Sequence, residues 1–191
     1  NASTLNNKTC FDGNNLNITS LYAQVNSVIL NGDSISYTDN IGISTVESNG
    51  ANTNITLNNN SNNTIFLNGK NSTLNTGNGN NTISVKGDNS TITTGSGKDN
   101  ITVSAKGVNV NSGSGDDTIT ISGSNATINS GAGNNIINAG GNSSSITTGN
   151  DANTINVTGN YVTVRTGNGT DTIKVTGTNA DIDSGDGNDY I

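Results

Sequence analysis

Carboxylates are the only side chains in this sequence that could carry acid–base or nucleophilic chemistry in any number. The 191 residues include 14 Asp and Glu, a single Cys and no His. Asp181 and Asp183 flank Ile182 and would both point outward from a strand, which gives two carboxylates with no evident catalytic partner. Catalysis of this kind needs a positioned acid and base of suitable pKa. We therefore expect this chain not to be an enzyme.

Ten of the fourteen acidic residues lie within a repeat of eighteen residues. Residues 112–119 return as residues 130–137, and the same pattern begins at Thr76, Thr94, Thr148, Thr166 and Ser184. A fixed period of this size is typical of a stack of near-identical units that bury their apolar faces only against one another. The carboxylates must therefore be positioned by the strands and turns of one repeating coil.

Two series of branched apolar residues define the strands of that coil. At nine-residue spacing, thirteen consecutive positions are Ile or Val: Ile83, Ile92, Ile101, Val110, Ile119, Ile128, Ile137, Ile146, Ile155, Val164, Ile173, Ile182 and Ile191. A second series, at eighteen-residue spacing, comprises Leu67, Val85, Val103, Ile121, Ala139, Val157 and Val175. Each member of the second series follows an Ile by two residues, so both point the same way from an extended strand. β-Branched residues flanked by Gly and Asn favour strands over helices.

Each unit therefore predicts a turn, a strand, a second turn and a second strand. We expect an all-β fold, a parallel β-roll or β-solenoid of 18-residue coils with two short strands and two turns per coil. Like residues of neighbouring coils would lie about 4.8 Å apart in parallel register. The usual hand of parallel crossovers predicts a right-handed stack.

Three sections of the chain differ in how closely they follow the repeat. Residues 1–26 do not fit it and are predicted to form an N-terminal cap or lead-in segment, with a short helix or edge strand at 17–25. Residues 27–57 are predicted to form irregular first coils, and residues 58–191 the regular solenoid. Solenoids need caps for solubility, which favours the interpretation of the first section as a cap.

The motif at residues 94–101, Thr-Gly-Ser-Gly-Lys-Asp-Asn-Ile, resembles the nonapeptide of the RTX (repeats-in-toxins) calcium-binding β-roll family. That family's pattern is G-G-x-G-x-D-x-U-x, and residues 112–119, 166–173 and 184–191 match it equally well. The resemblance covers roughly residues 58–191. It implies a right-handed parallel β-roll that binds Ca²⁺ between neighbouring turns on one edge, through motif Asp carboxylates and backbone carbonyls. Ca²⁺ accepts several oxygen ligands in flexible geometry.

Carried over residue by residue, the resemblance implies four Ca²⁺ ligands: Asp99, Asp117, Asp171 and Asp189. They form two pairs on adjacent coils, and these two gaps are the candidate calcium sites. The pattern also departs from the family, because Thr or Ser replaces the first motif glycine in every unit. The Asp position is taken by an uncharged residue at Asn81, Asn135 and Asn153. An alternative is that these Asp and Asn residues bond backbone N–H groups and form ladders without metal.

Composition excludes several kinds of partner. The net charge is −7, with 14 acidic and 7 basic residues, so no nucleic-acid footprint is present. No apolar run approaches the ~20 residues that span a bilayer, and we expect no membrane insertion. Cys10 stands alone, which rules out an internal disulfide. The chain begins without Met and stops inside a predicted strand, so we expect a processed chain or a fragment.

The uniform coils and a Thr-, Ser- and Asn-rich exterior favour an extracellular structural or adhesive module. We expect a stalk, surface-layer segment or fibre segment, secreted or at the cell surface of a bacterium or archaeon. Open strand edges could support end-to-end self-association, and a surface carbohydrate or protein is the other expected partner.

Two alternative functions follow from the same features. One is an accessory RTX-type repeat domain of a secreted enzyme or toxin. The other is an ice-binding β-solenoid that uses outward Thr pairs such as Thr91 and Thr93. Charged residues at equivalent positions, including Arg165 and Lys174, argue against a flat hydroxyl array.

Overall fold

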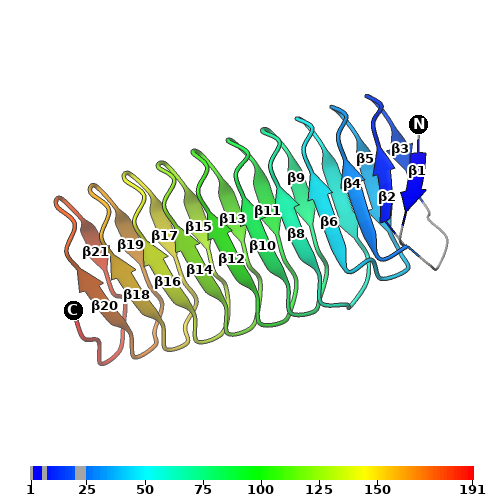
Figure 1. The fold of residues 1–191 in the computed structure, drawn as a ribbon. Coiled ribbons are helices and arrows are strands. Elements are labelled where there is room, and N and C mark those ends of the chain that lie inside the picture. The colour runs from blue at the N-terminus through cyan, green and yellow to red at the C-terminus, as the bar shows by residue number, and fades with distance from the viewer. Residues whose placement is uncertain (1, 6–7, 20–24) are drawn as a thin grey trace.

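The computed structural model describes residues 2–5, 8–19 and 25–191. These residues form an all-β parallel solenoid, in which the chain winds through two facing sheets and advances by one coil at a time (Figure 1). No helix among the described residues is long and apolar enough to cross a membrane. The predicted all-β parallel solenoid of 18-residue coils is confirmed by its two sheets and their register.

The two sheets share the strands in alternation along the chain. Sheet A has eleven strands: β1 (Ala2–Leu5), β2 (Lys8–Phe11), β4 (Ser27–Leu30), β6 (Thr45–Ser48), β8 (Thr64–Leu67), β10 (Thr82–Val85), β12 (Asn100–Val103), β14 (Thr118–Ile121), β16 (Ile136–Ala139), β18 (Thr154–Val157) and β20 (Thr172–Val175). Sheet B has ten: β3 (Asn17–Ile18), β5 (Ser36–Asp39), β7 (Asn54–Leu57), β9 (Thr73–Asn75), β11 (Thr91–Thr93), β13 (Asn109–Asn111), β15 (Thr127–Asn129), β17 (Ser145–Thr147), β19 (Thr163–Arg165) and β21 (Asp181–Asp183).

The register is parallel and follows the sequence period. From β8 onward, each residue in a strand of sheet A pairs with the residue eighteen positions later in the next strand, as Ile83 pairs with Ile101. Two earlier steps are one residue longer, since Lys8 pairs with Ser27 and Thr45 with Thr64. Two of the coils before the strict repeat therefore contain one extra residue each. The loops can accommodate this residue, because they lie outside the paired strands.

The predicted apolar series form the core. Ile83, Ile92, Ile101 and their successors as far as Ile173 are at most 1% exposed. In the last coil, Ile182 is half-buried and Ile191 is 66% exposed, since a neighbouring coil covers them on one side alone. Each coil thus buries its apolar residues against the coils before and after it, as expected for a repeat stack.

The first coil of the stack lies within the predicted lead-in segment. β2 pairs in parallel with β4, and β3 pairs in parallel with β5. β1 pairs with β2 in the antiparallel direction and forms the N-terminal edge of sheet A. Of the helix or edge strand predicted at 17–25, β3 covers the first two residues, and 20–24 lie outside the described residues.

Two kinds of turn join the sheets. We call the turn from sheet B to sheet A the first turn and the turn from sheet A to sheet B the second turn. The second turn places one residue per coil in the left-handed region, such as Asn71 and Asn89, both at φ 55°. Asn adopts this conformation more readily than most residues. In the first turn, Gly115 has φ 129°, and a Cβ there would overlap the carbonyl of Gly97 in the preceding coil.

Candidate functional site

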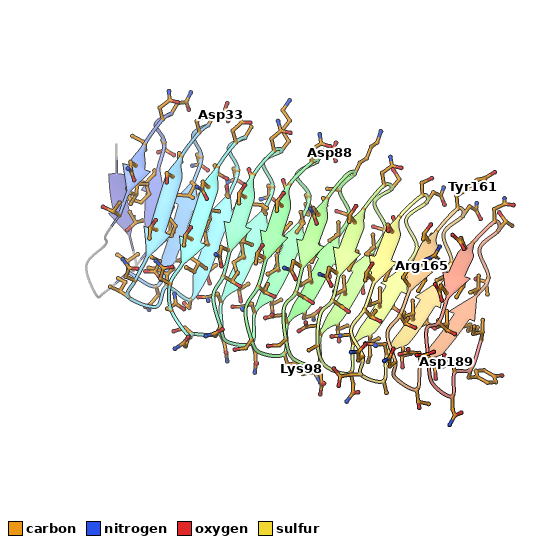
Figure 2. The ribbon with its side chains drawn as sticks, turned by 180° about the vertical axis from the view of Figure 1, so that it is seen from behind. Asp33, Asp88, Lys98, Tyr161, Arg165 and Asp189 are labelled. Carbon is orange, nitrogen blue, oxygen red and sulfur yellow. The ribbon has the colours of Figure 1, made fainter. Side chains whose placement is uncertain are left out.

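The motif Asp and Asn residues form one continuous series along the first-turn edge, each immediately before a strand of sheet A. We call this series the Asx ladder; its members are Asn63, Asn81, Asp99, Asp117, Asn135, Asn153, Asp171 and Asp189. All are buried except Asp189, which is half-buried. Figure 2 shows Asp189 and Lys98 along this edge, with Asp33 and Asp88 along the opposite one. The repeat thus brings the four predicted ligands into one line.

Each member of the Asx ladder binds the next through a backbone hydrogen bond. The N–H of Asn81 donates to Oδ1 of Asp99 (2.7 Å), and the N–H of Asp99 donates to Oδ1 of Asp117 (2.8 Å). Farther along, the N–H of Asp171 donates to Oδ1 of Asp189 (2.9 Å). The ladder of backbone N–H bonds that the sequence left open as an alternative is therefore present. Both predicted Asp pairs are direct neighbours within it.

Asn and Asp members differ in their second side-chain atom. In the Asn coils, Nδ2 donates to the carbonyl two residues earlier: from Asn81 to Gly79 (2.8 Å) and from Asn135 to Gly133 (2.9 Å). The same bond runs from Asn153 to the carbonyl of Asp151 (2.6 Å).

In the Asp coils, Oδ1 keeps its role as acceptor, so Oδ2 takes the place of the amide nitrogen. Oδ2 of Asp99, Asp117 and Asp171 is buried and has no hydrogen-bond partner. An acceptor oxygen then stands where the Asn coils place a donor to a carbonyl. Leaving a buried polar group unsatisfied costs about 1–3 kcal/mol, and more for a charged group. These three oxygens are therefore acceptors that the surrounding protein leaves without a partner.

The buried environment changes the acidity of Asp117. Burial, which disfavours the charged form, raises the pKa of Asp117 to about 6. The N–H of Asp99, which donates to Oδ1 of Asp117, opposes this rise, whereas the negative charges of Asp99 and Asp116 add to it. The Asp117 carboxyl group, which lies on one side of the first candidate gap, is thus a weaker acid than an ordinary Asp.

The donor atoms of each Asp pair fit a hard cation. Three carboxylate oxygens of the pairs lack a hydrogen bond, and oxygen atoms are the ligands that Ca²⁺ takes. By analogy with the Asn coils, in which Nδ2 contacts the carbonyl two residues earlier, the carbonyls of Gly97 and Gly115 are the backbone oxygens that would join them. Among the described residues, no three His, Cys, Asp or Glu side chains gather into one metal-binding group. A Ca²⁺ site here would combine two carboxylates with backbone oxygens.

The residues at the first motif position also face the interior of this edge. Thr94, Ser112, Ser130 and Thr148 are buried. Oγ1 of Thr94 donates to the Ser112 carbonyl (2.6 Å), and Oγ of Ser112 donates to the Ser130 carbonyl (3.0 Å). The hydroxyls of Ser130 and Thr148 have no partner. Sequence reasoning treated these residues only as departures from glycine; their presence as Ser or Thr in every unit was the available signal.

Exposed turn residues bond to the next coil in the opposite direction. Oδ1 of Asn80 accepts the N–H of Lys98, and Oδ1 of Asp116 accepts the N–H of Asn134, each at 2.8 Å. Asp116 is exposed to solvent, so its carboxylate has water available for its remaining lone pairs. This exposed acid, next to buried Asp117 in sequence, is a matched control for the buried positions.

The outward carboxylates of Asp181 and Asp183 have a cationic neighbour. Nη2 of Arg165 lies 2.6 Å from Oδ2 of Asp181, and Nε lies 3.8 Å from Oδ2 of Asp183. The sequence indicated no partner for this pair, although Arg165 is one coil away. Since the pair is engaged by a cation on the outer face of sheet B, it is better described as a surface ion-pair cluster than as an acid–base site.

Comparison with protein-family models, curated proteins and solved structures finds no match to this chain. The parallel β-solenoid implied by the RTX resemblance is present, with its 18-residue register, but no family match accompanies the resemblance.

Proposed function

We propose that this protein is a non-enzymatic extracellular structural or adhesive module, a stalk, surface-layer or fibre segment whose first-turn edge is stabilised by Ca²⁺. One observation carries the proposal: the stack contains two pairs of neighbouring carboxylates, and within these pairs Oδ2 of Asp99, Asp117 and Asp171 is buried without a protein partner. The regular coils and polar exterior of this protein suit a rod that holds other segments at a distance from a bacterial or archaeal surface.

The chain's own groups define how the edge would hold the ion. Asp99 and Asp117 supply carboxylate oxygens at one gap, and Asp171 and Asp189 supply them at the other. Bound Ca²⁺ supplies positive charge that offsets the two neighbouring carboxylates. Because the ligands come from successive coils, binding favours the stacked state over the unfolded chain.

The ends of the stack bear on end-to-end assembly. β1 covers the N-terminal edge of sheet A in the antiparallel direction. A second copy could continue sheet A in parallel register at this edge only after β1 had left it. Size-exclusion chromatography and electron microscopy at high concentration test this part of the proposal, which fails if only monomers are seen with and without residues 1–7.

Thermal unfolding in excess EDTA and in millimolar Ca²⁺, followed by circular dichroism, tests the cation. A ligand that binds only the folded state adds about 2.7 kcal/mol at a concentration of 100 Kd. We expect a higher unfolding temperature in Ca²⁺ for the unmodified protein and for Asp116→Asn, and a smaller increase for Asp99→Ala/Asp117→Ala. Unfolding curves that coincide at every Ca²⁺ concentration would contradict the proposal.

A second candidate function, ice binding, is favoured by the outer face of sheet B. From β5 to β17 every outward position is uncharged: Ser36, Thr38, Asn54, Thr56, Thr73, Asn75, Thr91, Thr93, Asn109, Asn111, Thr127, Asn129, Ser145 and Thr147. The charges that argue against a flat array on this sheet, on Arg165, Asp181 and Asp183, lie in the last two strands. Lys174 belongs to sheet A.

Thermal hysteresis measures this candidate directly. If sheet B binds ice, Thr91→Lys abolishes the hysteresis, whereas Thr102→Lys, on the outer face of sheet A, leaves it unchanged. Absence of hysteresis in the unmodified protein would remove this candidate and leave the cation-stabilised module untouched.

A further inference from the structure

We infer that the Asn amides of the Asx ladder take the place of the cation in their own coils. On this inference, the chain combines coils that are complete without a cation with two segments that require one. The inference rests on the proposed cation binding and specifies its number and location.

The Asn amide group bridges two oxygens. Nδ2 of Asn81 donates to the carbonyl of Gly79 (2.8 Å) and to Oδ1 of Asp99 in the next coil (3.0 Å). An amide nitrogen with two N–H groups can serve both acceptors at once. The amide therefore joins the turn carbonyl of one coil to the carboxylate of the next, which is what a hard cation does with oxygen ligands.

The same bridge recurs before the second Asp pair. Nδ2 of Asn153 donates to the carbonyl of Asp151 (2.6 Å) and to Oδ1 of Asp171 (3.1 Å). The bridge forms even though Asp151 replaces the third motif glycine in this unit. The bridge therefore does not depend on the glycine pattern of the turn. At Asn135 only one half of it is present, the bond from Nδ2 to the carbonyl of Gly133.

Within an Asp pair the bridging donor is absent. Oδ1 of Asp117 accepts the N–H of Asp99, and the position equivalent to Nδ2 is held by Oδ2 of Asp99, which has no partner. By analogy with Asn81, the oxygens to be joined are Oδ2 of Asp99, the carbonyl of Gly97 and Oδ1 of Asp117. The second set is Oδ2 of Asp171, the carbonyl of Gly169 and Oδ1 of Asp189.

The two sets are separated by coils that Asn completes. Asn135 donates to the Gly133 carbonyl and Asn153 to the Asp151 carbonyl, so neither coil lacks this bond. Asp99 and Asp171 lie four coils apart, or about 19 Å at ~4.8 Å per coil. Sites this far apart are expected to act independently. The structure therefore assigns two separate cation sites rather than a continuous row.

Calorimetric titration with CaCl₂, combined with thermal unfolding in EDTA, tests the assignment. We expect two equivalents bound by the unmodified protein, one by Asp99→Asn/Asp117→Asn and one by Asp171→Asn/Asp189→Asn. The variant with all four substitutions should bind none. It should also unfold in EDTA at a temperature higher than the unmodified protein by on the order of 5 °C, because each new amide adds the missing donor.

The control replaces exposed acids of the same turns. Asp116→Asn/Asp186→Asn should retain two equivalents and the original unfolding temperature, since both side chains are exposed. Continued binding of two equivalents by the fourfold variant, or a lower unfolding temperature of that variant in EDTA, would overturn this inference alone. Absence of Ca²⁺ binding by the unmodified protein would overturn the proposed cation stabilisation and the two-site assignment together.

Discussion

Asp39 and Asp117 are both buried at the first-turn edge, 2% and 0% exposed, yet their surroundings differ. The oxygens of Asp39 accept the N–H groups of Ile41 (3.1 Å), Gly42 (3.1 Å) and Ile43 (2.9 Å). Nδ2 of Asn59 adds a fourth bond (2.7 Å). Asp117 accepts one backbone N–H, and its Oδ2 has no partner.

The different number of hydrogen bonds to Asp39 and Asp117 follows from how regular the turn around each residue is. The loop after Asp39 is irregular and can fold three successive N–H groups around the carboxylate, as backbone nests do around anions. In the strict repeat, each coil presents a single backbone N–H to the Asx ladder, so a carboxylate there accepts one such bond where Asp39 accepts three. A regular stack therefore favours Asn at a buried Asx position, because Nδ2 of Asn donates to a turn carbonyl, whereas the second oxygen of Asp meets no backbone donor.

The largest expected effect comes from removing the well-satisfied carboxylate. Asp39→Ala leaves three N–H groups of a partly buried loop without their acceptor and should lower the free energy of unfolding by about 3–5 kcal/mol. Urea unfolding followed by circular dichroism measures this loss. Asp39→Asn keeps one acceptor oxygen and should lose less; equal stability of Asp39→Ala and the unmodified protein would break the comparison.

The contribution of Asp117 to the free energy of unfolding should change with pH in the direction opposite to that of a salt-bridged acid. Because the pKa of Asp117 is about 6 in the folded state, above the ordinary value of about 3.9, folding favours the protonated form. In cation-depleted buffer the Asp117 contribution to stability should grow as pH falls through 6 and be complete below about 4, reaching at most about 3 kcal/mol.

Comparison of the unmodified protein with Asp117→Asn separates the pH-dependent contribution of Asp117 from that of the other carboxylates. The variant should be the more stable at pH 7, and the two proteins should converge near pH 4. A stability difference that stays constant between pH 7 and pH 4 would show that Asp117 is not the group responsible.

A smaller effect is expected when a satisfied coil is given a carboxylate. Asn135→Asp replaces the donor to the Gly133 carbonyl with an acceptor and should lower stability in EDTA by about 2 kcal/mol at pH 7. Millimolar Ca²⁺ should restore part of the loss, since Asp117 and the new residue would then be neighbours. Thermal unfolding with and without Ca²⁺ checks both parts; Asn134→Asp, at an exposed turn position, is the control.

Much of the fold could be predicted because spacing alone decides which residues stack. The series from Ile83 to Ile173 fixed the core, the strands and the 18-residue register. The first coil at β2 and β3 was missed, since a step of nineteen residues hides it from an 18-residue pattern. An added loop residue leaves pairing intact but destroys the periodic signal that sequence reasoning depends on.

The candidate site was only partly predictable for a related reason. Period eighteen placed Asp99 beside Asp117, but it carries no information on which oxygen of a turn side chain meets an N–H. The Nδ2 bridge of Asn81 and the loop bonds of Asp39 depend on turn conformation. The buried hydroxyls of Thr94 and Ser112 occupy positions where the family pattern has glycine, so the pattern carries no information on their hydrogen bonds.

The constant register from β8 to β20 has a consequence for how such a chain can change in evolution. Any two neighbouring regular coils meet through the same backbone bonds, so excising or duplicating one whole coil recreates an interface of the same kind. Adding or removing whole coils would therefore change the length of the stack in steps of about 4.8 Å.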